Sequence, residues 1–229
     1  MTKFLSFLFL CLVTTSCMDD EMRRPVPGGA PQEKEFEEIK AVAHLPVHID
    51  STKYLLHPIG ELGEERSGYF SSGSSAGNNV FQSSDVLRGR MTNLKFQQLN
   101  SEELVPLTNE QVVIYSVQFL RSIFENTGKQ FLLYEMRDRD TNGDENLSEK
   151  DASSLYISNI NGENFRKLTP EGEHLLQLTV VDEMNRLYFR TREDSNGDGQ
   201  FDNNDRQHVY YVDLAPAALK VTAYFPLKS

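Results

Sequence analysis

The sequence predicts an all-β domain made of antiparallel sheets, and three observations support this prediction. From about residue 43 onward, apolar and polar residues alternate with a period of two, as in strands with one buried face. Short runs rich in glycine, asparagine, aspartate and serine separate the alternating segments, as expected for turns. A unit made of strand, acidic loop and strand also occurs twice, with Asp140 aligned to Asp194.

The individual elements follow from the same pattern. In 186–192, Leu187, Phe189 and Thr191 fall on one face of the predicted strand. The pair Asn161-Gly162 predicts a hairpin turn. The predicted strands are 45–49, 53–59, 78–82, 93–99, 112–120, 129–137, 154–160, 165–169, 174–181, 186–192, 208–214 and 219–224.

Two further segments are interpreted from composition and capping signals. Residues 111–125 allow two structures, because Thr108 and Gln111 could form a capping box for a helix, whereas their valines and isoleucine favour a strand. We expect the strand. Residues 60–77 are rich in glycine and serine and predict a long loop.

The segment "LYISNINGENFRKLT" (155–169) resembles the repeat of TolB-type β-propellers, with a strand, an Asn-Gly turn and a strand that ends in Leu-Thr. The resemblance covers about residues 93–225. It implies about three blade-like antiparallel sheets, fewer than the four or more that close a propeller ring. We therefore expect an open stack of blades, or a ring completed by homo-oligomerisation. The resemblance also implies an interaction platform.

The acidic segments are similar to the twelve-residue calcium loops of EF-hand and dockerin modules. Such loops bind Ca²⁺ through oxygen atoms at positions 1, 3, 5, 7, 9 and 12, with a sharp turn at position 6. Residues 194–205 fill every position, with Gly199 at position 6 and the apolar Phe201 at position 8. The ligands that this resemblance implies are Asp194, Asn196, Asp198, Gln200 (carbonyl), Asp202 and Asp205.

The first acidic segment allows two frames. A loop that starts at Asp138 has Gly143 at position 6 but the charged Glu145 at position 8. A loop that starts at Asp140 has the apolar Leu147 at position 8 but Glu145 at position 6, where a left-handed backbone favours glycine. The repeat alignment favours the second frame, whose implied ligands are Asp140, Asn142, Asp144, Asn146 (carbonyl), Ser148 and Asp151.

These loops predict two Ca²⁺ sites, of which the second is the stronger. The flanking segments are predicted strands, whereas calcium sensors respond by moving flanking helices. We therefore expect a structural ion that holds strand ends together and offsets carboxylate repulsion, rather than a switch.

The N-terminal residues have the features of a bacterial lipoprotein signal. Residues 1–16 contain one early lysine and a short apolar run, and "TTSC" resembles a lipobox that ends at Cys17. We expect lipidation of Cys17, a flexible tether over 17–42 and a folded domain over 43–229. Acids directly after Cys17 resemble a signal for the outer face of the outer membrane, so between the periplasmic and cell-surface faces we favour the surface.

Composition bears on the function classes. The only cysteines are Cys11 and Cys17, so the predicted mature domain has no thiol for a disulfide or a nucleophile. The net charge of −11, without a basic stripe, argues against a nucleic-acid partner. The two acidic segments carry much of that charge: six acids and two bases in 138–151, and five acids and two bases in 192–206.

Signals for catalysis are weak, and we do not expect an enzyme. "GSSAG" around Ser75 matches a hydrolase motif, but it lies in a serine- and glycine-rich loop with no helix signal after it. The histidines are scattered, and Pro46 prevents a helical pair between His44 and His48. The sequence thus predicts a calcium-binding, membrane-anchored module with a protein or glycan partner. The alternative is an accessory or degenerate subunit of a carbohydrate- or peptide-processing surface system.

Overall fold

A computed structural model describes residues 41–60 and 85–227. The chain divides into two compact units, 1–38 and 39–229, and every described residue belongs to the second. The predicted signal, Cys17, most of the tether, the motif around Ser75 and the predicted strand 78–82 lie outside the described residues.

The described residues form antiparallel sheets, which confirms the all-β prediction. The larger sheet has nine strands, in the order β1-β3-β4-β6-β7-β8-β9, with β2 paired to β3 and β5 paired to β4. These strands are β1 (Val42–Ala43), β2 (Val47–His48), β3 (Tyr54–Gly60), β4 (Val86–Gln98), β5 (Val105–Pro106), β6 (Val113–Phe119), β7 (Phe131–Arg137), β8 (Ser154–Asn159) and β9 (Arg166–Lys167).

The smaller sheet is a meander of four strands, β10-β11-β12-β13. Its strands are β10 (Glu173–Val181), β11 (Arg186–Glu193), β12 (Arg206–Asp213) and β13 (Val221–Ala223), with a 3-10 turn, Asp182–Met184, between β10 and β11. Leu187, Phe189 and Thr191 of β11 are buried, as the alternation predicted.

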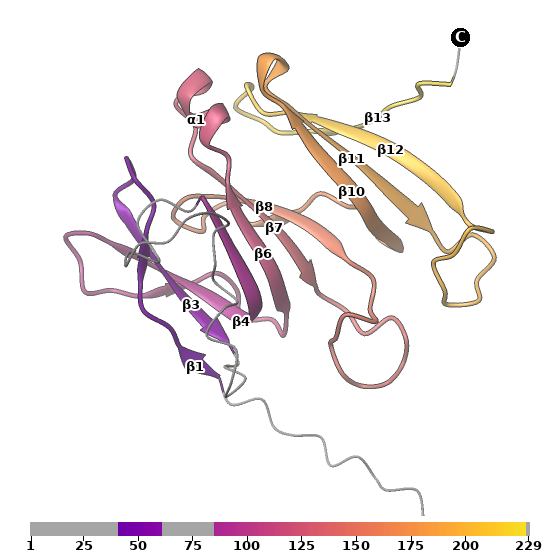
Figure 1. The fold of residues 1–229 in the computed structure, drawn as a ribbon, viewed down its shortest axis with the longest axis horizontal. Helices are drawn as coiled ribbons and strands as arrows, with labels where there is room; N and C mark the ends of the chain where they lie inside the picture. Colours follow the sequence, from indigo (N-terminus) through magenta and orange to yellow (C-terminus); the bar gives the residue numbers. More distant parts are fainter. Residues whose placement is uncertain (1–40, 61–84, 228–229) are drawn as a thin grey trace, which may run out of the picture. The chain divides into compact units, whose positions relative to one another are not determined.

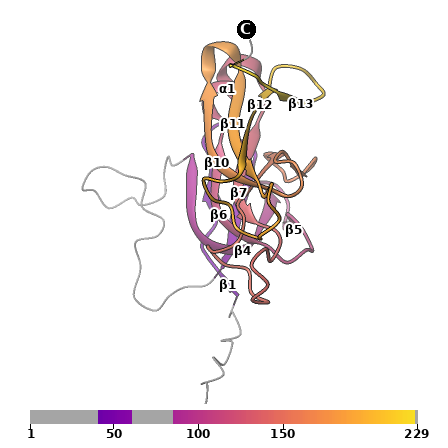
Figure 2. The same cartoon turned by 90° about the vertical axis from the view of Figure 1, so that its right-hand side faces the viewer.

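The strands pack as three layers around two apolar cores. Leu132, Tyr134 and Met136 of β7 belong to a core shared with β3 and β4. Phe131 and Leu133, on the opposite face of β7, belong to a core shared with β10, β11 and β12. The layer of β6, β7 and β8 is therefore buried on both faces, and it lies between the other two groups of strands (Figure 1). In the orthogonal view, β10 to β12 lie in front of β6 and β7 (Figure 2).

The prediction of about three separate sheets differs from the two hydrogen-bonded sheets observed. The reason is the length of β4, whose residues 86–91 pair with β6 while residues 91–98 pair with β3. Register shifts near Met91 mark the junction. One strand thus joins two layers that the sequence predicts as independent sheets.

The ambiguous segment 111–125 contains both a strand and the start of a helix. β6 occupies 113–119 as expected, and α1 (Arg121–Thr127) follows it. Gly128 ends the helix in the left-handed conformation, with its N–H donated to the carbonyl of Phe124. Within the described ranges, no helix is both long and apolar enough to span a bilayer.

Candidate metal sites in two equivalent loops

Each acidic segment connects two neighbouring antiparallel strands. The first lies between β7 and β8, and the second lies between β11 and β12. Both loops extend beyond the ends of the strands that they join (Figure 1). The predicted unit of strand, acidic loop and strand is therefore present twice.

The carboxylate at position 1 organises the first half of each loop. Asp140 accepts the N–H groups of Gly143 and Glu145, each at 2.7 Å. Asp194 accepts those of Gly197 at 2.8 Å and of Gly199 at 2.9 Å. The four acceptor contacts are related by the same offset as the sequence repeat, so the two loops fold in the same way.

The carboxylate at position 12 closes each loop. Asp151 accepts the N–H of Thr141 at 2.9 Å and of Ser148 at 2.7 Å. In the second loop, Asp205 accepts the N–H of Ser195 at 3.0 Å and that of Asp202, at position 9, also at 3.0 Å. Asp151 is only 2% exposed and Asp205 only 7% exposed. Each loop thus holds one largely buried carboxylate at its base.

The side chains at positions 3 and 5 each accept the backbone N–H of the residue two positions later. Asn142 accepts the N–H of Asp144 at 2.9 Å, and Asp144 accepts that of Asn146 at 3.1 Å. In the second loop, Asn196 accepts the N–H of Asp198 at 3.0 Å, and Asp198 accepts that of Gln200 at 2.9 Å. At position 9, Ser148 and Asp202 each accept the N–H of the residue two positions later.

The backbone conformations of the two loops match at the residues that the repeat alignment pairs. Gly143 and Glu145 have positive φ angles of 75° and 62°, and the aligned Gly197 and Gly199 have 74° and 77°. Glu145 therefore adopts at position 6 the left-handed conformation that glycine adopts in the second loop.

This geometry predicts that Glu145→Gly stabilises the protein. Glycine removes the strain of a left-handed non-glycine residue, but it also makes the unfolded chain more flexible. Because the first effect is the larger, we expect the free energy of unfolding to rise by about 0.5–1 kcal/mol. Urea denaturation measures this change. Glu149→Gly is the matched control, since it removes a carboxylate from the same loop at a residue without a positive φ, and it should destabilise. Equal effects of the two substitutions would contradict the strain argument.

Asp138, the first residue of the other frame, binds side chains that lie outside the loop. It forms an ion pair with Lys167 at 2.7 Å and accepts the hydroxyls of Ser154 at 2.7 Å and Tyr156 at 2.8 Å. Burial acts to raise the pKa of Asp138, but these hydrogen bonds together hold it below its ordinary value. No local pattern in the sequence links Asp138 to Lys167, which is 29 residues away, so this network was not predictable from the sequence.

The residues at position 8 anchor the loops differently. Leu147 is buried, whereas the half-buried ring of Phe201 lies 5.4 Å from the ring of His174. His174 also accepts the N–H of Ser153 at 2.8 Å, directly after the first loop. Burial, together with the positive charges of Arg137 and Arg192, lowers the pKa of His174. The imidazole thus contacts Phe201 of the second loop and Ser153, two residues after the first loop. No sequence signal distinguishes His174 from the other histidines.

The loops fit a hard cation by the chemistry of their donors. Asp, Asn, Ser and carbonyl groups offer only oxygen ligands to an ion, as Ca²⁺ requires. Hydrogen bonds from the N–H groups of Asp202 and Ser195 lower the pKa of Asp205, so this carboxylate stays ionised well below neutral pH. Within residues 41–60 and 85–227, however, no three His, Cys, Asp or Glu side chains converge as a ready metal centre, since the loop carboxylates turn toward backbone N–H groups.

Comparisons with known proteins do not assign the chain to a family. Protein-family models, curated proteins and solved structures gave no significant match.

Proposed function

We propose that the protein is a calcium-binding, lipid-anchored extracytoplasmic module whose ions are structural. The observation that supports calcium most strongly is the repetition, contact for contact, of the same hydrogen-bond pattern around Asp140 and Asp151 and around Asp194 and Asp205. Both loops offer only oxygen donors, and each joins paired strands, so a bound ion would hold strand ends in place.

The anchoring part of the proposal depends on the sequence. Residues 1–16 would serve as the export signal, and Cys17 would carry the lipid at the outer membrane, with the surface face favoured. Metabolic labelling of cells with a radioactive fatty acid tests this point. We expect labelled protein from the wild-type chain and none from Cys17→Ser, while label on the variant would contradict lipidation at this residue.

The layered architecture suggests a binding or scaffolding role. We propose that the three layers correspond to three blade-like units, because each packs face to face on the next through an apolar core. The stack is either open or completed by a second copy of the chain. Light scattering across a concentration series separates these alternatives, since a monomer at every concentration contradicts the completed ring.

Calcium removal provides the decisive test. Extracellular sites bind Ca²⁺ with Kd on the order of 10⁻⁴–10⁻³ M, which at 1 mM gives about 0.5–1.5 kcal/mol per site by mass action. For a domain of this size we expect excess chelator to lower Tm by about 2–4 °C for each kcal/mol lost. Differential scanning calorimetry of the full chain in neutral detergent measures the shift.

Two variants make this test specific. Asp194→Asn removes one charge from the second loop and should abolish about half of the calcium-dependent Tm shift or more. Glu183→Gln removes one charge outside both loops, from an exposed residue between β10 and β11, and should leave the shift unchanged. A melting curve insensitive to chelator, with no heat on titration with Ca²⁺, would overturn the proposal.

A further inference from the structure

A groove with no acidic residue lies between the middle layer and the segment that joins β12 to β13. It consists of a cavity of about 250 Å³ and a second of about 440 Å³. The two cavities share four lining residues: Phe131, Asn159, Asn164 and Ala217. No Asp or Glu is among the described residues that line either cavity, although the chain has a net charge of −11. Its position away from both acidic loops makes it a separate feature.

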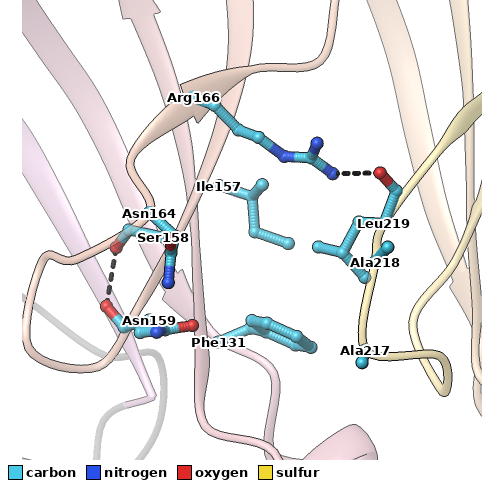
Figure 3. A pocket seen from close by; sticks show the side chains of 9 residues that line it. All are labelled: Phe131, Ile157, Ser158, Asn159, Asn164, Arg166, Ala217, Ala218 and Leu219. Carbon is cyan, nitrogen blue, oxygen red and sulfur yellow. Dashed lines mark hydrogen bonds between the residues drawn. The ribbon is translucent and has the colours of Figure 1, made fainter.

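The groove combines an apolar floor with a polar rim. Phe131 and Ile157 come from the neighbouring strands β7 and β8 and lie on the same face of the sheet, where they form the apolar floor of the smaller cavity. Figure 3 shows Asn159 and Asn164 on one side of this floor and Leu219 on the other. Phe131 is 8% exposed and Ile157 is 1% exposed, so packing in the second core fixes both side chains. A rigid apolar floor of this kind accepts a ring with an apolar face.

The rim carries two side-chain amide groups that are available for hydrogen bonds to a ligand. Within the described residues, the side-chain amides of Asn159 and Asn164 form no hydrogen bond to a protein atom. Each amide can both donate and accept, which matches the hydroxyl groups of a sugar better than it matches a purely accepting or purely apolar ligand.

Two cations line the same groove. Arg166 donates to the carbonyl of Leu219 at 2.7 Å, and Lys129 donates to the carbonyls of Ala215, at 2.6 Å, and Pro216. These acceptors are neutral, so the positive charges of Arg166 and Lys129 are not cancelled by an adjacent carboxylate within the groove. The groove therefore favours a ligand that brings its own negative charge.

From this combination we propose that the groove binds a hexuronic acid residue of an acidic glycan. The pyranose ring lies over the floor of Phe131 and Ile157, next to the segment 217–219. Its hydroxyls pair with Asn159 and Asn164, and its carboxylate lies toward Arg166. The cavity volumes accommodate one or two sugar units. This inference rests on the proposed binding role, because it names the ligand class, but it does not depend on calcium.

Saturation-transfer NMR on the full chain in neutral detergent tests the inference. The probes are the methyl glycosides of glucuronic, galacturonic and mannuronic acid, with methyl glucoside as the neutral match and N-acetyl-dialanine as a carboxylate that is not a sugar. We expect at least one uronide to bind at least tenfold more tightly than both controls. Equal binding of the glucoside overturns the charge argument, and equal binding of the peptide, or no binding of any uronide, overturns the glycan.

Substitutions locate the binding in the groove. Arg166→Gln should weaken uronide binding at least tenfold. Asn164→Gly removes the amide without backbone strain, because residue 164 has a φ of 56° that glycine adopts freely, and it should weaken binding severalfold. Arg190→Gln, at an exposed arginine on β11, should have no effect. Unchanged affinity in Asn164→Gly and Arg166→Gln, both folded by their melting curves, overturns the site.

The experiment also separates this inference from the calcium proposal. The NMR titrations are made with excess chelator, whereas the calcium proposal is read from the melting temperature. Loss of uronide binding with an intact calcium-dependent Tm shift would refute the glycan site alone, and uronide binding without a Tm shift would refute calcium alone.

Discussion

Asp138→Ala is expected to lower the free energy of unfolding by about 3 kcal/mol or more. The side chains of Asp138 and Lys167 are only 16% and 14% exposed, so the substitution leaves an ammonium group largely buried without its main partner. The hydroxyls of Ser154 and Tyr156 lose their acceptor as well. Guanidinium denaturation measures the loss.

The matched control is the second partner of the same lysine. Glu171 lies 3.2 Å from the Lys167 ammonium, but its side chain is 75% exposed. Exposed pairs contribute about 0–1 kcal/mol, so Glu171→Ala should have a small effect. Equal losses for the two substitutions would show that burial of the Asp138 pair does not determine its contribution.

The contribution of Asp138 should also depend on pH in a defined direction. Its pKa in the folded state lies below the ordinary value of 3.8, so the folded protein favours the ionised form. The stability that this provides is complete above about the ordinary pKa and is lost as the pH falls through the lowered one. The stability difference between the wild-type protein and Asp138→Asn should therefore be constant near neutral pH and shrink below about pH 4.

Gly162→Ala is expected to lower the free energy of unfolding by about 2–3 kcal/mol. Gly162 has a φ of +82°, and an added Cβ would lie 2.5 Å from a ring carbon of Phe96. Phe96 is 2% exposed in the core between the first two layers, so its ring has little room to move. Strain in the backbone and overpacking of the ring therefore act together, and urea denaturation measures their sum.

Gly172→Ala isolates the first of these causes. Gly172 has nearly the same φ, +78°, but an added Cβ there meets no atom within 4 Å. We expect this control to lose only about 1 kcal/mol, the cost of a left-handed alanine. If Gly162→Ala lowers the free energy of unfolding no more than Gly172→Ala does, the contact with Phe96 does not overpack the core.

The strands were predictable because their signal is local. The predicted segments 53–59, 129–137, 154–160, 186–192 and 208–214 each coincide with an observed strand to within two residues at either end. Alternation records which face is buried, and the residues that produce it are neighbours in the chain. The Asn161-Gly162 signal correctly places a turn between β8 and β9, although the connection is longer than two residues, because β9 starts only at Arg166.

Helix α1 shows where local signals fail. Leu120 stands at its N-terminal cap and makes no capping hydrogen bond through its side chain, so no start signal is present in the sequence. Ile123 is fully buried in the core shared with β10 to β12. The helix thus depends on packing against strands that lie some 50 residues later in the chain.

By itself, the sequence determined the strands, the two units of strand, acidic loop and strand, and the order of the oxygen-bearing side chains within each acidic loop. The reason is that alternation between neighbouring residues marks the strands, and hydrogen bonds between residues close in the chain shape each loop. Only the tertiary structure decided that β4 joins two layers, that Lys167 pairs with Asp138, that His174 lies between Ser153 and Phe201, and that Asn164 and Arg166 line one groove with Leu219. These pairings join distant segments through packed side chains, and neither composition nor periodicity carries information about which segments meet.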